Sequence, residues 1–155
     1  MPIDAMIIII VVGIFSVYVF YLIGIYIKLE NRRSLILSKF TEIDTQIGNK
    51  LDLAKELTDL YEDKKLNKVR TDLFNSATVN DKIKFNKKLD KLVNEIDTTS
   101  RKIKKIIKSM NEINDKIDYS KEFYNDSLVE FNHILSTRSG KILAKIFKYS
   151  KYNTF

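Results

Sequence analysis

A run of 22 residues, 6–27, contains no charged side chain and is rich in Ile, Val, Phe and Tyr. As a helix rising about 1.5 Å per residue, such a run extends about 33 Å and matches a hydrocarbon core about 30 Å thick. A cleaved signal peptide has a basic start, a shorter apolar stretch and a small-residue cleavage site, and these features are missing here. We therefore expect an uncleaved transmembrane helix rather than the core helix of a soluble domain.

Charge is distributed unevenly about this run. Asp4 is the only charged side chain of the first 27 residues, whereas Lys28, Arg32 and Arg33 follow the run closely. Because positive charge beside a transmembrane helix is retained in the cytoplasm, the N-terminus is expected to face outward. The expected protein is a single-pass protein of the cell membrane with three parts: a short extracytoplasmic N-terminus (1–5), a transmembrane helix (6–27) and a cytoplasmic helical bundle domain (28–155).

The remainder of the chain is expected to be all-α. Only 4 Gly and 1 Pro are present, too few turn-formers for the many tight connections of a β sandwich or barrel. Apolar residues after the run recur at steps of three and four, which predicts a first long helix. A cluster of small polar residues at 75–81 predicts a turn with a capping residue for the next helix. The apolar stripe of the first long helix consists of Ile36, Phe40, Ile43, Ile47, Leu51, Ala54, Leu57 and Tyr61.

The second half of the chain has an unbroken 3-4 alternation of seam positions, which predicts one long helix with left-handed, coiled-coil-like packing. Gly140 is expected to end this helix in a left-handed conformation, and a short amphipathic helix is expected at 142–149. Two such helices bury only one stripe each, so either they fold into a three- or four-helix bundle or other copies complete the seams. The expected fold is an antiparallel helical hairpin or bundle behind the transmembrane helix. The seam residues seven apart are Leu89, Ile96, Ile103, Met110, Ile117, Tyr124 and Phe131, with Leu92, Thr99, Ile106, Ile113, Ser120, Ser127 and Ile134 between them.

Few residues suggest catalysis or metal binding. The chain has no Cys and one His, His133, which forms a Glu-x-x-His pair with Glu130. Di-iron bundles need two such pairs, and a second His is missing, so we interpret His133 as a partly exposed helix residue. Acidic residues between 52 and 63 are interpreted as a solvated face opposed by lysines of the second helix. Glycine-rich phosphate loops, Ser/His/Asp sets and zinc-protease motifs are also missing. We expect no enzyme activity, no catalytic or metal-binding residue and no cofactor.

The basic charge leaves several partners open. The chain has a formal net charge of +7, and residues 64–108 hold 14 Lys or Arg against 5 Asp or Glu, so the excess is concentrated there. A lysine-rich helix, 82–108, is either a solvated face or a surface for the anionic inner leaflet, worth about 1 kcal/mol per residue close to the membrane. Nucleic acid is disfavoured, because the run 101–108 contains no aromatic residue and no nucleic-acid motif is found.

In the C-terminal third, Ile117 is followed by Tyr124-Asn125 and then by Phe131-Asn132. This pattern resembles that of the LemA family. Residues 117–132 are similar to its I-x-x-x-R-x-x-Y-N-x-x-V-x-x-Y-N signature, and residues 43–47 to its I-D-x-Q-L motif. Tyr26 matches the tyrosine just after the family's anchor. The chain departs from the family at Lys55 and Ser139, which replace prolines, at Lys121, which replaces the arginine, and in lacking a Y-P-x-L stretch. It therefore resembles a divergent, shortened member.

The resemblance implies an antiparallel helical bundle on a membrane anchor with most of the protein cytoplasmic, and it implies no enzymatic activity. The expected partners are the lipid bilayer, with anionic lipid contact as one option, and a second copy or another protein. The expected function is that of a non-enzymatic interaction or scaffold protein. The family-motif residues, which we interpret as structural, are Phe40, Ile43, Asp44, Gln46, Asp52, Leu53, Ile117, Tyr124, Asn125, Phe131, Asn132, Ala144 and Phe147.

Overall fold

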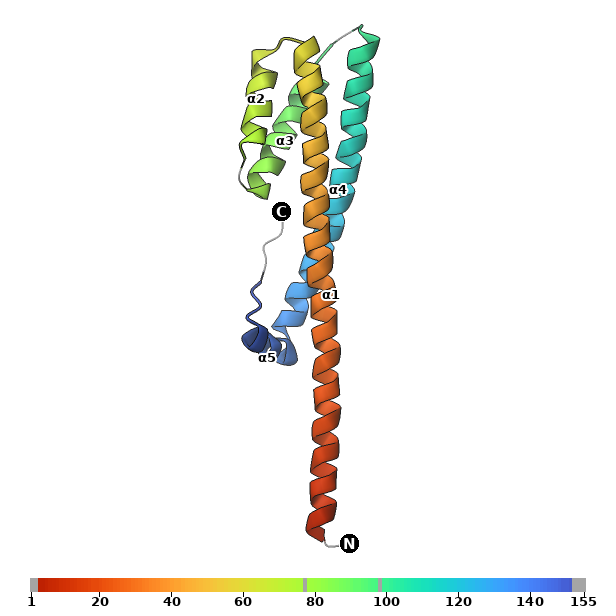
Figure 1. The fold of residues 1–155 in the computed structure, drawn as a ribbon, viewed down its shortest axis with the longest axis vertical. Helices are drawn as coiled ribbons and strands as arrows, with labels where there is room; N and C mark the ends of the chain where they lie inside the picture. The colour runs from red at the N-terminus through yellow and green to blue at the C-terminus, as the bar shows by residue number, and fades with distance from the viewer. Residues whose placement is uncertain (1–2, 77, 98, 152–155) are drawn as a thin grey trace. The chain divides into compact units, whose positions relative to one another are not determined.

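The computed structural model describes residues 3–76, 78–97 and 99–151. This part of the chain is helical and contains no strand, which confirms the expected all-α class. Residues 1–2, 77 and 152–155, which belong to the predicted N-terminus, turn and C-terminus, lie outside it. The helices are α1 (Ile3–Leu60), α2 (Lys64–Phe74), α3 (Val79–Asn94), α4 (Arg101–Ser136) and α5 (Arg138–Phe147) (Figure 1).

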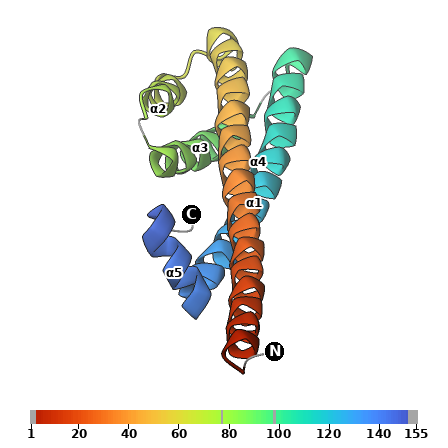
Figure 2. The same cartoon turned by 60° about the horizontal axis from the view of Figure 1, so that its bottom comes forward.

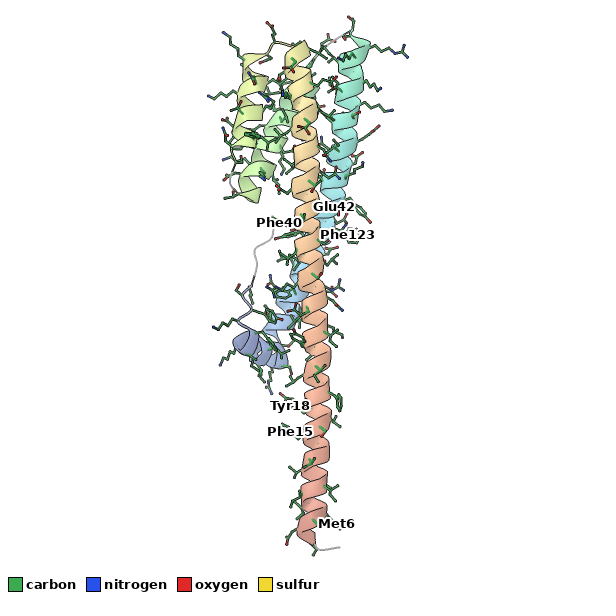
Figure 3. The ribbon with its side chains drawn as sticks, viewed as in Figure 1. Met6, Phe15, Tyr18, Phe40, Glu42 and Phe123 are labelled. Atoms are coloured by element: carbon green, nitrogen blue, oxygen red, sulfur yellow. The ribbon has the colours of Figure 1, made fainter. Side chains whose placement is uncertain are left out.

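The apolar run and the first long helix form one uninterrupted helix, α1, of 58 residues. By length and composition α1 is long and apolar enough to cross a membrane, and its most apolar 18-residue stretch is wholly unburied. Met6, Phe15 and Tyr18 are exposed and lie on the stretch of α1 that extends past α5 (Figure 3). The structure thus places no boundary between the predicted span and the helix that follows it.

The chain divides into two compact units. Of the described residues, 3–37 and 124–151 form the first unit, and those within 38–123 form the second. The long helices α1 and α4 each contribute to both units. We describe each unit by itself.

The core of the first unit is formed by α1, α4 and α5. Thr137 separates α4 from α5: its hydroxyl donates to the carbonyl oxygen of Ile134 (2.7 Å) and accepts from the amide of Gly140 (3.0 Å), so it caps α5. The buried residues are Leu29 and Ile36 of α1, Tyr124, Ser127, Leu128, Phe131 and Leu135 of α4, and Gly140 and Leu143 of α5.

The expectation that Gly140 ends a helix in the left-handed region is wrong. Gly140 lies inside α5, and no described glycine has a positive φ. A Cβ at this position would lie 1.9 Å from the carbonyl oxygen of Ile134, so glycine is needed for close backbone approach. The left-handed residue is instead Lys148 (φ 55°), which caps the C-terminus of α5.

The core of the second unit is formed by α1, α2, α3 and α4, with α2 packed on α3 (Figure 2). Asp63 ends the break after α1, because its carboxylate accepts from the amides of Lys65 (2.6 Å) and Leu66 (3.2 Å) and so caps α2. Thr78 caps α3 by accepting from the amide of Asp81 (3.1 Å), which confirms the predicted cap, although residues 79–81 of the predicted turn belong to α3. The buried apolar residues are Ile43, Ile47, Ala54, Leu57, Leu66, Leu73, Leu89, Val93, Ile103, Ile106, Met110 and Ile117.

The predicted single helix through the second half is also wrong, because α3 ends at Asn94 and α4 begins at Arg101. Ile96 and Thr99 were expected on the seam and lie between the two helices. Asp97, Thr99 and Ser100 are short polar residues whose side chains compete for backbone hydrogen bonds and disfavour a helix interior. The seam residues of α4 itself, from Ile103 to Phe131 in steps of seven, are buried as predicted.

The two glycines Gly48 and Gly140 provide a matched test of this packing. Around Gly48, which is exposed on α1, a Cβ meets nothing within 4 Å, so we expect Gly48→Ala to stabilise the protein by up to about 1 kcal/mol. Gly140→Ala should lower the unfolding midpoint, because the new Cβ displaces the Ile134 carbonyl. The measurement is unfolding of the full chain in detergent, followed by circular dichroism. A rise in midpoint for both variants contradicts the close approach at Gly140.

Candidate functional site

The most unusual chemical group of the second unit is a lysine in its core. Lys50 of α1 is 0% exposed. It lies on the seven-residue spacing that also contains the buried Ile36, Ile43 and Leu57. Of the residues expected on the stripe, Leu51 is only half-buried and Phe40 and Tyr61 are exposed, so the predicted stripe was wrong at these three positions.

The ammonium group of Lys50 connects three helices. It donates to the carboxylate of Asp90 on α3 and to the amide oxygen of Asn114 on α4. The amide nitrogen of Asn114 donates in turn to the same Asp90 carboxylate (2.9 Å). These three side chains, which we call the Lys50 network, satisfy one another inside a core whose other buried residues are mostly apolar.

Burial lowers the pKa of Lys50, because desolvation disfavours its charged form, and the hydrogen bond and negative charge of Asp90 partly offset this effect. A buried ion pair adds little net stability compared with apolar side chains of equal size. Removing one partner is costly, however, because the remaining charge stays buried. The Lys50 network therefore favours the one arrangement of α1, α3 and α4 in which all three groups meet.

A polar cavity of about 120 Å³ lies beside the Lys50 network, between α3 and α4. Asn86, Asp90, Asn114, Asp118 and Lys121 line it. The side-chain oxygen of Asn86 is buried and has no hydrogen-bond partner among the described residues. The cavity is polar and large enough for water molecules, which occupy about 30 Å³ each in the liquid.

The predicted Glu-x-x-His pair does not converge on a metal site. Glu130 forms a salt bridge with Arg32 (Nε–Oε2 2.6 Å), and His133 is exposed beside Lys28 and Arg32, whose positive charges disfavour a cation. Across the described residues, no group of three or more His, Cys, Asp or Glu side chains is placed to hold a metal ion. On the acidic face of α1, Glu56 lies 3.4 Å from the ammonium of Lys102 on α4, as expected for a face opposed by lysines.

The predicted lysine-rich helix, 82–108, is not one helix, because the break between α3 and α4 divides it. Lys82 forms an ion pair with Asp44 of α1, and Lys102 pairs with Glu56. Two of its lysines therefore neutralise carboxylates within the second unit.

The family-motif residues are distributed over both units. The residues from Phe40 to Leu53, together with Ile117, belong to the second unit, and those from Tyr124 to Phe147 belong to the first. The structural role that we expect for them stays a prediction. Ile43, Ile117, Tyr124 and Phe131 are buried, Asp44, Gln46, Leu53, Asn125, Asn132 and Ala144 are half-buried, and Phe40, Asp52 and Phe147 are exposed.

A cluster of aromatic rings in the first unit was not anticipated from the sequence. The rings of Tyr26 and Phe147 lie 4.7 Å apart between centroids, and Tyr149 packs edge-on against Phe131 at 5.9 Å. The Tyr149 hydroxyl donates to the carboxylate of Glu30. Burial, reinforced by this hydrogen bond, raises the pKa of Tyr149 well above its ordinary value. We call Tyr26, Phe131, Phe147 and Tyr149 the aromatic cluster.

The Lys50 network predicts that removing one of its partners lowers the free energy of unfolding. Asp90→Asn leaves the Lys50 charge buried without a counter-charge, so we expect a loss of about 3 kcal/mol in the free energy of unfolding. Asp52→Asn, on the exposed face of α1, should change it by less than about 0.5 kcal/mol. Adding Lys50→Met to Asp90→Asn should restore part of the loss. Denaturant unfolding of the full chain in detergent measures all three. Equal effects of Asp90→Asn and Asp52→Asn contradict the network.

The comparisons with known proteins do not assign the chain to a family. No protein-family model, no curated protein and no solved structure matches it. The LemA resemblance therefore stays a prediction based on the motifs of the sequence.

Proposed function

We propose that the protein is a membrane-anchored, non-enzymatic helical interaction protein, a divergent and shortened member of the LemA family. The single observation that carries the proposal is the continuity of α1. Its N-terminal part is apolar and unburied, and the same helix then provides buried residues to both compact units. A helix of this kind anchors a helical domain at a bilayer.

The proposed orientation places the N-terminus outside and the helical domain in the cytoplasm, with the span at residues 6–27 of the cell membrane. The basic residues Lys28, Arg32 and Arg33 after the run support it, as does the near absence of charge before the run. Tyr26 supports the inner boundary, because tyrosine rings favour the membrane–water interface.

We also infer an antiparallel, coiled-coil-like pairing of α1 and α4. Buried residues recur every seven positions on both helices, as in Ile36, Ile43, Lys50 and Leu57 of α1. On α4 the same spacing runs from Ile103 to Phe131. The spacing of seven supports left-handed packing.

An exposed aromatic surface on the second unit supports an interaction role. Tyr119 and Phe123 of α4 are exposed and adjacent, with ring centroids 4.6 Å apart. The ammonium of Lys39 lies 5.6 Å from the ring centroid of Tyr119 and 5.7 Å from that of Phe123. It also donates a hydrogen bond to the carboxylate of Glu42 (2.7 Å), and this bond lowers the pKa of Glu42. Glu42 and Phe123 are labelled in Figure 3. Aromatic residues are enriched at protein-binding surfaces, so the exposed pair supports such a surface.

The alternative is binding of anionic lipid or nucleic acid through residues 82–108. Exposed lysines such as Lys104, Lys105 and Lys108 favour it. The break between α3 and α4 and the pairing of Lys82 and Lys102 with carboxylates weaken it, because they reduce the continuous basic face that such binding uses.

Site-specific crosslinking tests the interaction role. We expect a photoreactive phenylalanine analogue at Tyr119 of the full chain, in native membranes, to crosslink to a second copy or to one defined protein. The matched control carries the same analogue at Phe74, which is exposed at the end of α2 and should give monomer. Monomer alone at both positions contradicts the proposal.

A further inference from the structure

The short helix α5 has an exposed apolar edge beside a basic face. Ile142 and Ile146, one turn apart, are 42% and 63% exposed, and Phe147 is 47% exposed. Gly140 and Leu143, which point toward the core of the first unit, are buried. The exposed basic residues of the helix and its cap are Arg138, Lys141, Lys145 and Lys148.

Contacts within the first unit place α5 at the end of the apolar run. Phe147 packs on Tyr26, which lies one residue before the run ends, and Tyr149 donates to Glu30, three residues beyond it. In Figures 1 and 2 the N-terminal part of α1 extends past α5, which belongs to the same unit. The apolar edge of α5 therefore lies at the level where the run of apolar residues meets the charged part of α1.

We propose that α5 is an interfacial membrane helix that lies in the headgroup region of an anionic leaflet. This proposal rests on the proposed membrane anchor. Ile142 and Ile146 insert toward the acyl chains, and the basic residues contact anionic headgroups. An apolar edge beside a Lys/Arg-rich face is the composition of helices that bind the bilayer interface. Its place next to Tyr26 continues the proposed span, so α5 reaches lipid without any movement.

A second copy of the chain suits this surface less well than lipid. The sequence of α5 contains Arg138, Lys141 and Lys145 and no acidic residue. Two copies of α5 packed edge to edge would bring like charges together, which is destabilising. Anionic lipid provides both the apolar phase for the isoleucines and the opposite charge for the lysines.

The chain contains no tryptophan, so a single introduced tryptophan reports on one position. We would reconstitute the full chain in vesicles of phosphatidylcholine and phosphatidylglycerol, with or without bromine on the lipid acyl chains. Four variants are compared: Phe15→Trp in the run, Ile142→Trp and Ile146→Trp on α5, and Phe74→Trp on the second unit, where Phe74 is 76% exposed. We expect brominated lipid to reduce the emission of Phe15→Trp and Ile146→Trp by about half and that of Phe74→Trp hardly at all.

The outcomes separate the two proposals. Unquenched Phe15→Trp overturns the membrane anchor itself. The placement of α5 alone is overturned if Phe15→Trp is quenched while Ile146→Trp and Ile142→Trp are not. Ile142→Trp is included so that the result does not depend on a local effect of the substitution at Ile146. Quenching of Phe74→Trp equal to that of Ile146→Trp also contradicts the proposal, because contact is then not specific to α5.

Charge reversal tests whether the basic residues of α5 contact anionic headgroups. Lys141→Glu with Lys145→Glu, in the Ile146→Trp background, should reduce quenching in vesicles that contain phosphatidylglycerol and leave that of Phe15→Trp unchanged. Equal quenching before and after the reversal overturns the role of anionic headgroups. Circular dichroism of each variant confirms that the helices are retained.

Discussion

In the proposed arrangement, the backbone of α1 lies in two environments, the bilayer and the helical bundle, as one helix. Over residues 6–21 its side chains are almost all apolar and are exposed, and water is a poor environment for such a surface. From Leu29 onward the same helix buries a residue at intervals of three, four or seven within the two compact units. A helix satisfies its backbone hydrogen bonds internally in either environment, so it can pass from bilayer to bundle without a break. The proposed anchor, the orientation and the placement of α5 all depend on this continuity.

In the second unit, the alignment of α1, α3 and α4 is specified by a buried lysine, a residue that an apolar core normally excludes. Lys50 is buried only because Asp90 and Asn114 meet its ammonium group. A shift of α1 by one residue would replace Lys50 by Leu51 and leave Asp90 and Asn114 without their shared partner. Apolar residues alone tolerate small shifts between helices, whereas a buried charge does not. In the first unit, Gly140 fixes the corner between α4 and α5 in a different way, by allowing its backbone to approach the Ile134 carbonyl.

Much of the fold could be predicted from periodicity, because apolar spacing reflects local geometry. Ile117, Tyr124 and Phe131 were predicted on the seam and are buried. Lys50 and Leu51 both fit steps of three and four, and the apolar residue was the natural choice. Burial of Lys50 depends on partners 40 and 64 residues away, which no local pattern contains. Ile96 and Thr99 fit the spacing of seven equally well, and only the short polar residues around Thr99 indicated the break. The aromatic cluster joins Tyr26 to Phe147 and Tyr149, and such contacts follow from the tertiary fold alone.

Hydrogen exchange of the full chain in bilayer nanodiscs tests the central claim, that residues 6–27 of α1 lie within a membrane. Because α1 is one continuous helix, its own hydrogen bonds set no boundary near residue 27. A boundary in exchange rate near residue 27 therefore has to come from the exclusion of water by lipid. The account predicts that the amides of residues 6–27 exchange more slowly than any other part of the chain, with a step near residue 27. Exchange of residues 6–27 as fast as that of the linker residues 61–63 would contradict it.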